Sequence, residues 1–341
     1  MNQNSLGKPE REYWIDAVRS FACLCVITTH APIPNGSSGA WIIPFYNYMA
    51  VGGASILFFM ISGALILYKE KPVIPFLKTR LTRIFFPMVV WTIITLLWDY
   101  AEGSIDAKTL LYKTIHIPFG PQVGVYWFIY DVFGIYLLTP ILASWLSRCS
   151  RKDVLFYLFV WGFTLLLPYL RLIDPLFDGL TDYTSGYLYH FYGYLGFAVL
   201  GYYLRRYVSI AKVKPVHLLL SSASVLFLFI AYYFTNIPHS VVQDRLGINI
   251  VCLAISYFLV IKHLPLPHRS KHIFYDFAQH SFGIYLVHLL VMRRILWPLL
   301  ADYDVNYMLQ IPLITLLTAG MSYLVVHILS KLPYSKYFIG L

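Results

Sequence analysis

The stretch that decides the fold runs from Ser20 to Tyr68 and reads SFACLCVITTHAPIPNGSSGAWIIPFYNYMAVGGASILFFMISGALILY. Its 49 residues include no Lys, Arg, Asp or Glu. A helix needs about 20 mostly apolar residues to cross a hydrocarbon core roughly 30 Å thick. The stretch therefore has room for two membrane spans and a loop, and it is too long for a helix in a soluble core.

The composition of the whole chain agrees with a membrane protein. Of the 341 residues, 59% are apolar and only 12% are charged, whereas a soluble domain carries about 25% charged residues. This balance excludes a solvated globule and a disordered chain. The four cysteines form no metal-binding or disulfide pattern, and no metal site is expected.

The hydropathy pattern predicts an all-α, polytopic integral membrane protein with about ten transmembrane helices. No repeat or linker divides the chain, so residues 1–341 are expected to form one transmembrane domain. The predicted spans are 13–33, 50–68, 84–101, 123–146, 154–172, 187–204, 216–235, 246–263, 277–298 and 307–329.

The distribution of basic residues predicts the orientation of these spans. The segments predicted on one side of the membrane hold 19 Lys and Arg residues, and the loops on the other side hold 6. The basic segments are 1–12, 69–83, 147–153, 205–215, 262–272 and 330–341. By the positive-inside rule the richer side is cytoplasmic, which places both termini in the cytoplasm. Since these loops also explain the net charge of +10, no nucleic-acid partner is expected.

Two ionisable residues of the first predicted span are candidates for function, because such groups are costly inside a membrane. Arg19 and His30 are eleven residues apart, which is almost three helical turns, so one helix would present both on the same face about 16 Å apart. The alternative for Arg19 is a pair with Asp16 that reaches toward the membrane surface. A single buried His is more often a structural hydrogen-bonding residue than a catalyst.

A second basic feature precedes the third predicted span. Arg80 and Arg83 are three residues apart and share a face if this segment is helical. Guanidinium groups bind phosphates through paired hydrogen bonds, so the two residues are candidates for holding a nucleotide-like ligand. The alternative is an ordinary basic flank of a membrane helix.

Further polar and aromatic residues are candidates for binding an acceptor substrate. Tyr126 and Trp127 fit either an aromatic belt at the membrane surface or the lining of a sugar pocket. Ser281, Tyr285 and His288 fall on one helical face, as a polar lining or as partners in hydrogen bonds between helices. Arg293 lies on the side that is poor in basic residues, and it is a candidate for contact with lipid headgroups or with an acidic acceptor.

Taken together and in this order, the Arg19–His30 spacing, residues 58–63, the Arg80/Arg83 pair and residues 281–288 resemble the membrane-bound acyltransferase family 3. The branch that O-acetylates enterobacterial common antigen is similar at residues 13–16 with 22–23, and at residues 280–281 with 283–285. The resemblance covers nearly the whole chain. One departure is Tyr126, since the family often has a His at this position.

The resemblance implies a membrane O-acetyltransferase of the bacterial cytoplasmic membrane. It implies acetyl-CoA as a cytosolic donor cosubstrate with no permanently bound cofactor, and a cell-surface glycan or its lipid-linked precursor as acceptor. His30 and Arg19 are then the catalytic residues, with His30 as general base or as transient acyl carrier. Arg80 and Arg83 are expected to hold the donor phosphates, with Arg19 beside the donor arm or the reacting centre.

A different class of protein also fits ten spans with a polar interior. A multi-span transporter of a lipid-linked saccharide or a small polar metabolite is the alternative. Transporters often have two related halves with interrupted helices at corresponding positions, and the sequence shows no such correspondence. Membrane lipids are expected partners in either case, and the sequence leaves the oligomeric state open.

Overall fold

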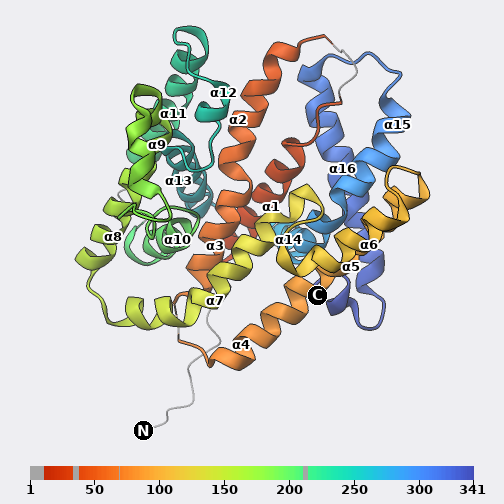
Figure 1. The fold of residues 1–341 in the computed structure, drawn as a ribbon, viewed down its shortest axis with the longest axis horizontal. Helices are drawn as coiled ribbons and strands as arrows, with labels where there is room; N and C mark the ends of the chain where they lie inside the picture. The colour runs from red at the N-terminus through yellow and green to blue at the C-terminus, as the bar shows by residue number, and fades with distance from the viewer. Residues whose placement is uncertain (1–10, 34–37, 69, 210–213) are drawn as a thin grey trace.

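The structure is a computed structural model that describes residues 11–33, 38–68, 70–209 and 214–341 (Figure 1). The described residues form helices and no strand, which confirms the all-α prediction. The longer helices are α1 (Tyr13–Thr28), α2 (Ile43–Gly53), α3 (Ser55–Ile66), α4 (Val73–Arg80), α5 (Phe86–Ala101), α6 (Ala107–His116), α7 (Trp127–Arg148), α8 (Arg151–Thr164), α10 (Leu195–Tyr207), α11 (Lys214–Tyr233), α13 (Ile248–His263), α14 (His268–Leu290) and α16 (Tyr307–Ser330). Three short helices are α9 (Leu167–Ile173), α12 (His239–Val242) and α15 (Trp297–Leu300).

Within the described part of the chain, seven helical segments are long and apolar enough to cross a membrane. The chain therefore has the architecture of a multi-pass membrane protein. The predicted spans 13–33, 187–204 and 246–263 fall on α1, α10 and α13, which have 16, 13 and 16 residues and are shorter than a bilayer requires. The seven segments are Ala40–Ile66, Val73–Ala101, Ala107–Arg148, Arg151–Ile173, Pro215–Tyr233, Arg269–Leu300 and Tyr307–Ser330.

The second predicted span, 50–68, begins ten residues too late. The observed segment is Ala40–Ile66, because Pro44 lies in the first turn of α2, where proline is tolerated, and does not mark a loop. The segment is divided at Ala54, whose ψ of −117° is not helical. This break follows Gly52 and Gly53 and separates α2 from α3.

The helices form two packed groups that meet in the middle of the molecule. Helices α8 to α13 lie on one side in Figure 1 and α5, α6, α15 and α16 on the other, with α1, α3 and α14 between them. One hydrophobic cluster contains residues of α3, α10 and α13, and a second contains residues of α1, α14 and α16. Phe58 and Phe128 pack against both clusters, so they mark the seam between them.

Small residues allow α3 and α10 to approach closely. A Cβ atom added at Gly63 would overlap the backbone of Ala198, and one added at Gly201 would overlap the backbone of Met60. Both overlaps are with main-chain atoms, which cannot rotate away. Close backbone contact through glycine is a common way for membrane helices to associate.

Gly63→Ala and Gly201→Ala are therefore expected to destabilise the protein by about 1–3 kcal/mol each, the cost of inserting an extra methyl group into a packed interface. Gly134→Ala in α7 is the matched control, because a Cβ there meets no atom within 4 Å. Thermal unfolding in detergent measures the difference. Unchanged stability of Gly63→Ala would contradict the close crossing.

Segments that were predicted to share the basic side of the membrane lie together. Arg205 forms an ion pair with Glu12, and Ser147 Oγ donates a hydrogen bond of 2.9 Å to Glu70. These contacts join parts of the chain that are far apart in sequence. The grouping agrees with the positive-inside pattern, and the assignment of this side to the cytoplasm stays a prediction.

Candidate active site

Three arginines line one cavity of about 300 Å³ at the seam. Arg19 comes from α1, Arg80 is the last residue of α4, and Arg83 lies in the π-helical turn Leu81–Phe85 that joins α4 to α5. The sequence prediction that Arg80 and Arg83 share a helical segment is consistent with this turn. We call this space the arginine cavity.

The guanidinium groups of the arginine cavity have no carboxylate partner within the described residues. None of the ion pairs formed there includes Arg19, Arg80 or Arg83. Arg80 instead lies 5.2 Å from the ring centroid of Phe76 and 5.1 Å from that of Tyr136, and its buried Nε has no hydrogen-bond partner. The cavity thus holds positive charge that is available to an anionic ligand.

The alternative pairing of Arg19 with Asp16 is wrong. The carboxylate of Asp16 accepts hydrogen bonds from Arg11 Nε at 2.9 Å and from Arg11 Nη2 at 3.1 Å. Asp16 is buried, and Arg11 reaches it from just before the start of α1. Arg19 forms no ion pair with Asp16 and lines the arginine cavity, and it also borders a neighbouring cavity of about 320 Å³ that Asp16 and Arg11 line.

His30 lines a second, smaller cavity of about 130 Å³ together with Trp127 and Arg245. We call it the histidine cavity. The expectation that Arg19 and His30 belong to one continuous helix is wrong, because α1 ends at Thr28. Ala31 precedes Pro32, and a residue before proline disfavours the helical conformation. His30 still makes a turn, with its N–H donating to the carbonyl oxygen of Ile27 at 3.0 Å.

The two cavities meet at a pair of aromatic residues. Phe128 of α7 and Tyr285 of α14 line both spaces, and their ring centroids are 5.9 Å apart. Tyr285 is held in place because its hydroxyl donates a hydrogen bond to the carbonyl oxygen of Val125. A ligand in the arginine cavity and a ligand in the histidine cavity would therefore approach each other across Phe128 and Tyr285.

His288 lies one helical turn beyond Tyr285 and beside His30. The His30 and His288 ring centroids are 5.7 Å apart, and His288 is fully buried. Its Nδ1 is 2.6 Å from the carbonyl oxygen of Tyr285, so this nitrogen carries the proton that the carbonyl accepts. The other nitrogen, Nε2, is buried without a hydrogen-bond partner and is free to accept one.

The remaining predicted site residues are distributed differently. Ser281 lines the arginine cavity, and its hydroxyl donates to the carbonyl oxygen of Ala278 at 2.8 Å. Tyr126 packs in the interior, donating to the carbonyl oxygen of Leu286 at 2.7 Å, and neither cavity includes it. Arg293 is exposed, with its guanidinium carbon 5.5 Å from the Trp297 ring centroid, and it also lies outside both linings.

The sequence analysis missed several lining residues. Phe128 completes the aromatic run that begins at Tyr126, but no local pattern places it between two cavities. Arg245 gives a weak signal, since it is one of the 6 basic residues on the side poor in them. Gly340, with a φ of +78°, and Leu341 also line the arginine cavity, and Gly340 packs against the backbone of Arg83.

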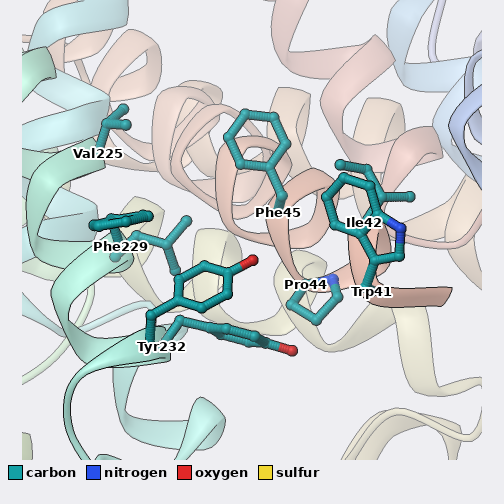
Figure 2. Close-up of a pocket in the computed structure, with 9 residues that line it drawn as sticks. Trp41, Ile42, Pro44, Phe45, Val225, Phe229 and Tyr232 are labelled. Atoms are coloured by element: carbon teal, nitrogen blue, oxygen red, sulfur yellow. The ribbon is translucent and has the colours of Figure 1, made fainter. Parts of the chain in front are cut away.

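A third cavity, of about 310 Å³, contains none of the predicted residues. Figure 2 shows Trp41, Pro44 and Phe45 on one wall and Phe229 and Tyr232 on the other. Its lining is apolar and aromatic and has no charged group. This is the surface expected of a helix pair facing lipid, and the predicted arginines and His30 lie in the other two cavities.

Comparison with protein families gives a match over nearly the whole chain. The family model described as an acyltransferase domain, acyltransferase family 3, matches residues 12–327. This range includes α1, the arginine pair and α14, and hence every predicted site residue. No curated protein and no solved structure matches the chain.

Proposed function

The chain belongs to acyltransferase family 3, and on that premise we propose that it is a membrane O-acetyltransferase. It takes an acetyl group from cytosolic acetyl-CoA and places it on a hydroxyl of a cell-surface glycan or its lipid-linked precursor. The observation that supports this most is the meeting of two cavities at Phe128 and Tyr285, with arginines in one and His30 in the other.

The arginine cavity suits the donor. Acetyl-CoA carries about four negative charges at its nucleotide end, and guanidinium groups bind phosphates through paired hydrogen bonds. Arg80 and Arg83 receive these phosphates in the proposal, and Arg19 lies beside the pantetheine arm. The thioester then points toward Phe128 and Tyr285, with Ser281 along the wall of the same space.

The histidine cavity suits the acceptor, and His30 has two routes. As general base, His30 takes the proton from the acceptor hydroxyl while the hydroxyl oxygen attacks the thioester carbonyl carbon. The C–S bond breaks, and coenzyme A leaves as a thiolate that later regains a proton. As nucleophile, an imidazole nitrogen of His30 attacks the thioester carbonyl carbon, the C–S bond breaks, and coenzyme A leaves as a thiolate. The acceptor hydroxyl then attacks the acyl-histidine, the C–N bond breaks to free His30, and the hydroxyl proton passes through solvent to the thiolate. His288 offers Nε2 as a hydrogen-bond acceptor close to either reaction.

The biological setting follows from the same proposal. The protein would reside in the bacterial cytoplasmic membrane and act on an envelope polysaccharide, as in the branch that O-acetylates enterobacterial common antigen. Tyr126 and Arg293 remain predicted acceptor-binding residues, although they lie outside the two cavity linings.

The test uses purified protein in nanodiscs with labelled acetyl-CoA and a crude envelope-glycan extract. We expect release of free coenzyme A that depends on the glycan, together with labelled glycan. Binding of acetyl-CoA without turnover by any extract, or no binding by folded protein, would contradict an acetyltransferase. In the latter case, transfer from succinyl-CoA would replace the acetyl group in the proposal, and no transfer from either donor would favour a transporter.

A further inference from the structure

Arg245 is a cation at the catalytic centre that the proposed function leaves without a task. It lies in the loop between α12 and α13 and lines the histidine cavity with His30 and Trp127. Its guanidinium carbon is 4.9 Å from the centroid of the Trp127 ring. This is within the range of a cation–π contact, which fixes the plane and position of the guanidinium group.

The loop that carries Arg245 is held on both sides. Gln243 Nε2 donates to the carbonyl oxygen of Pro44 in α2 at 3.3 Å, and the Gly247 N–H donates to the carbonyl oxygen of Asp244 at 2.9 Å. Asp244 is itself engaged, accepting a hydrogen bond from the Leu246 N–H at 2.9 Å. Arg245 is thus presented from a preorganised backbone.

No anionic group of the protein neutralises Arg245 in the part of the chain that the structure describes, because none of the ion pairs there includes it. Two other arginines from the same side of the membrane differ in this respect. Arg171 pairs with Asp178, and Arg294 pairs with Asp99 and Glu102. Arg245 is also exposed, so a ligand entering the histidine cavity can reach its guanidinium donors.

The contact with Arg245 also gives the Trp127 ring a supporting role. One side of its ring meets Arg245, and its centroid is 5.3 Å from that of Tyr194. The ring therefore supports the guanidinium group, which makes Trp127 a positioning residue for Arg245.

We propose that Arg245, supported by Trp127, is the subsite for a negatively charged group of the acceptor. The inference rests on the proposed function and narrows its acceptor to an anionic saccharide. The shared chemistry is a pair of anionic oxygens, which match the two parallel N–H donors of a guanidinium group. A sugar-acid carboxylate and the phosphate of a lipid-linked sugar both supply it. Binding of that group at Arg245 would bring a neighbouring sugar hydroxyl to His30.

The experiment measures acetyl transfer in nanodiscs to three defined acceptors: a neutral oligosaccharide, an oligosaccharide with a uronate, and a neutral sugar on a prenyl phosphate. Wild-type protein is expected to prefer at least one of the two anionic acceptors. In Arg245→Gln, the KM for that acceptor should rise about 10- to 100-fold, the effect of losing charge-assisted hydrogen bonds. The KM for acetyl-CoA should not change. The anionic acceptor whose KM rises in Arg245→Gln shows whether the charged group is a carboxylate or a phosphate.

Two further variants make the result specific. Arg245→Lys keeps the charge but loses the paired donors, so it should recover only part of the affinity. Lys108→Gln removes an exposed cation from the same predicted side, outside the cavity, and should have no effect. Equal losses for neutral and anionic acceptors in Arg245→Gln, or a wild-type preference for the neutral acceptor, would overturn the inference. Failure of wild type with all three acceptors would instead count against the proposed function.

Discussion

His30→Ala is expected to lower the rate of acetyl transfer by about 100- to 10,000-fold, which is the usual contribution of a positioned acid–base group. The reason for this loss is the position of His30 in the histidine cavity. His30 places an imidazole in the lining of the histidine cavity, which can take a proton from a hydroxyl or carry an acyl group, and this cavity meets the arginine cavity at Phe128 and Tyr285. Binding of acetyl-CoA should be kept, because His30 does not line the arginine cavity.

The measurement compares coenzyme A release and donor binding for wild type, His30→Ala, His30→Gln and His190→Ala. His190 is an exposed His of a loop outside both cavities, so its replacement controls for the loss of an imidazole. His30→Gln keeps a polar side chain at the site and guards against a folding defect. Near wild-type transfer by either His30 variant would remove His30 from the chemistry.

The same measurement separates the two routes for His30. Label that stays on wild-type protein in the absence of acceptor, and is lost in His30→Gln, would assign the acyl-histidine route. Release of coenzyme A only in the presence of acceptor, with no labelled protein, would assign the general-base route.

Arg80→Gln and Arg83→Gln are each expected to weaken acetyl-CoA binding by about 10- to 100-fold, since hydrogen bonds to charged groups contribute about 1.5–3 kcal/mol. Arg80 has an unpartnered buried Nε, and both residues lack carboxylate partners among the described residues. Lys78→Gln is the matched control, because it removes a charge from α4 at an exposed position outside the cavity.

A donor that lacks one phosphate tests which arginine binds that phosphate. Acetyl-CoA without its 3′-phosphate should bind wild type more weakly, and the loss should shrink in the variant whose arginine meets that phosphate. Equal affinity of wild type and both arginine variants for the complete donor would contradict the arginine cavity as the donor site. A loss in Lys78→Gln of the same size would reduce the effect to general surface charge.

The class of protein and much of the site could be predicted from sequence because their signals are local. An uncharged run of 49 residues is visible without a structure, and so are Arg19 directly before it and His30 inside it. The pair Arg80 and Arg83 is likewise a short-range pattern. Each of these features reflects the cost of placing polar groups near lipid, which is the same in every fold.

The other features of the site and the fold depend on contacts between distant residues or on local breaks that periodicity does not show. Arg245 reaches the site only because its loop packs against α2 and its guanidinium lies over Trp127, 118 positions earlier in the chain. The end of α1 at Thr28 depends on the local proline pattern, which a periodicity argument for Arg19 and His30 overlooks. Helices α1 and α10 are shorter than the predicted spans 13–33 and 187–204, because the hydropathy windows extended these two spans into loops.

The most direct test of the account is the side from which the donor acts. Membrane-impermeant acetyl-CoA is supplied to inside-out and to right-side-out membrane vesicles that contain the wild-type protein, with the acceptor present on both sides. We predict acetyl transfer when the donor faces the side of Arg80 and Arg83, and none when it faces only the opposite side. Transfer supported equally from both sides, or only from the side of the histidine cavity, would contradict the two-cavity mechanism.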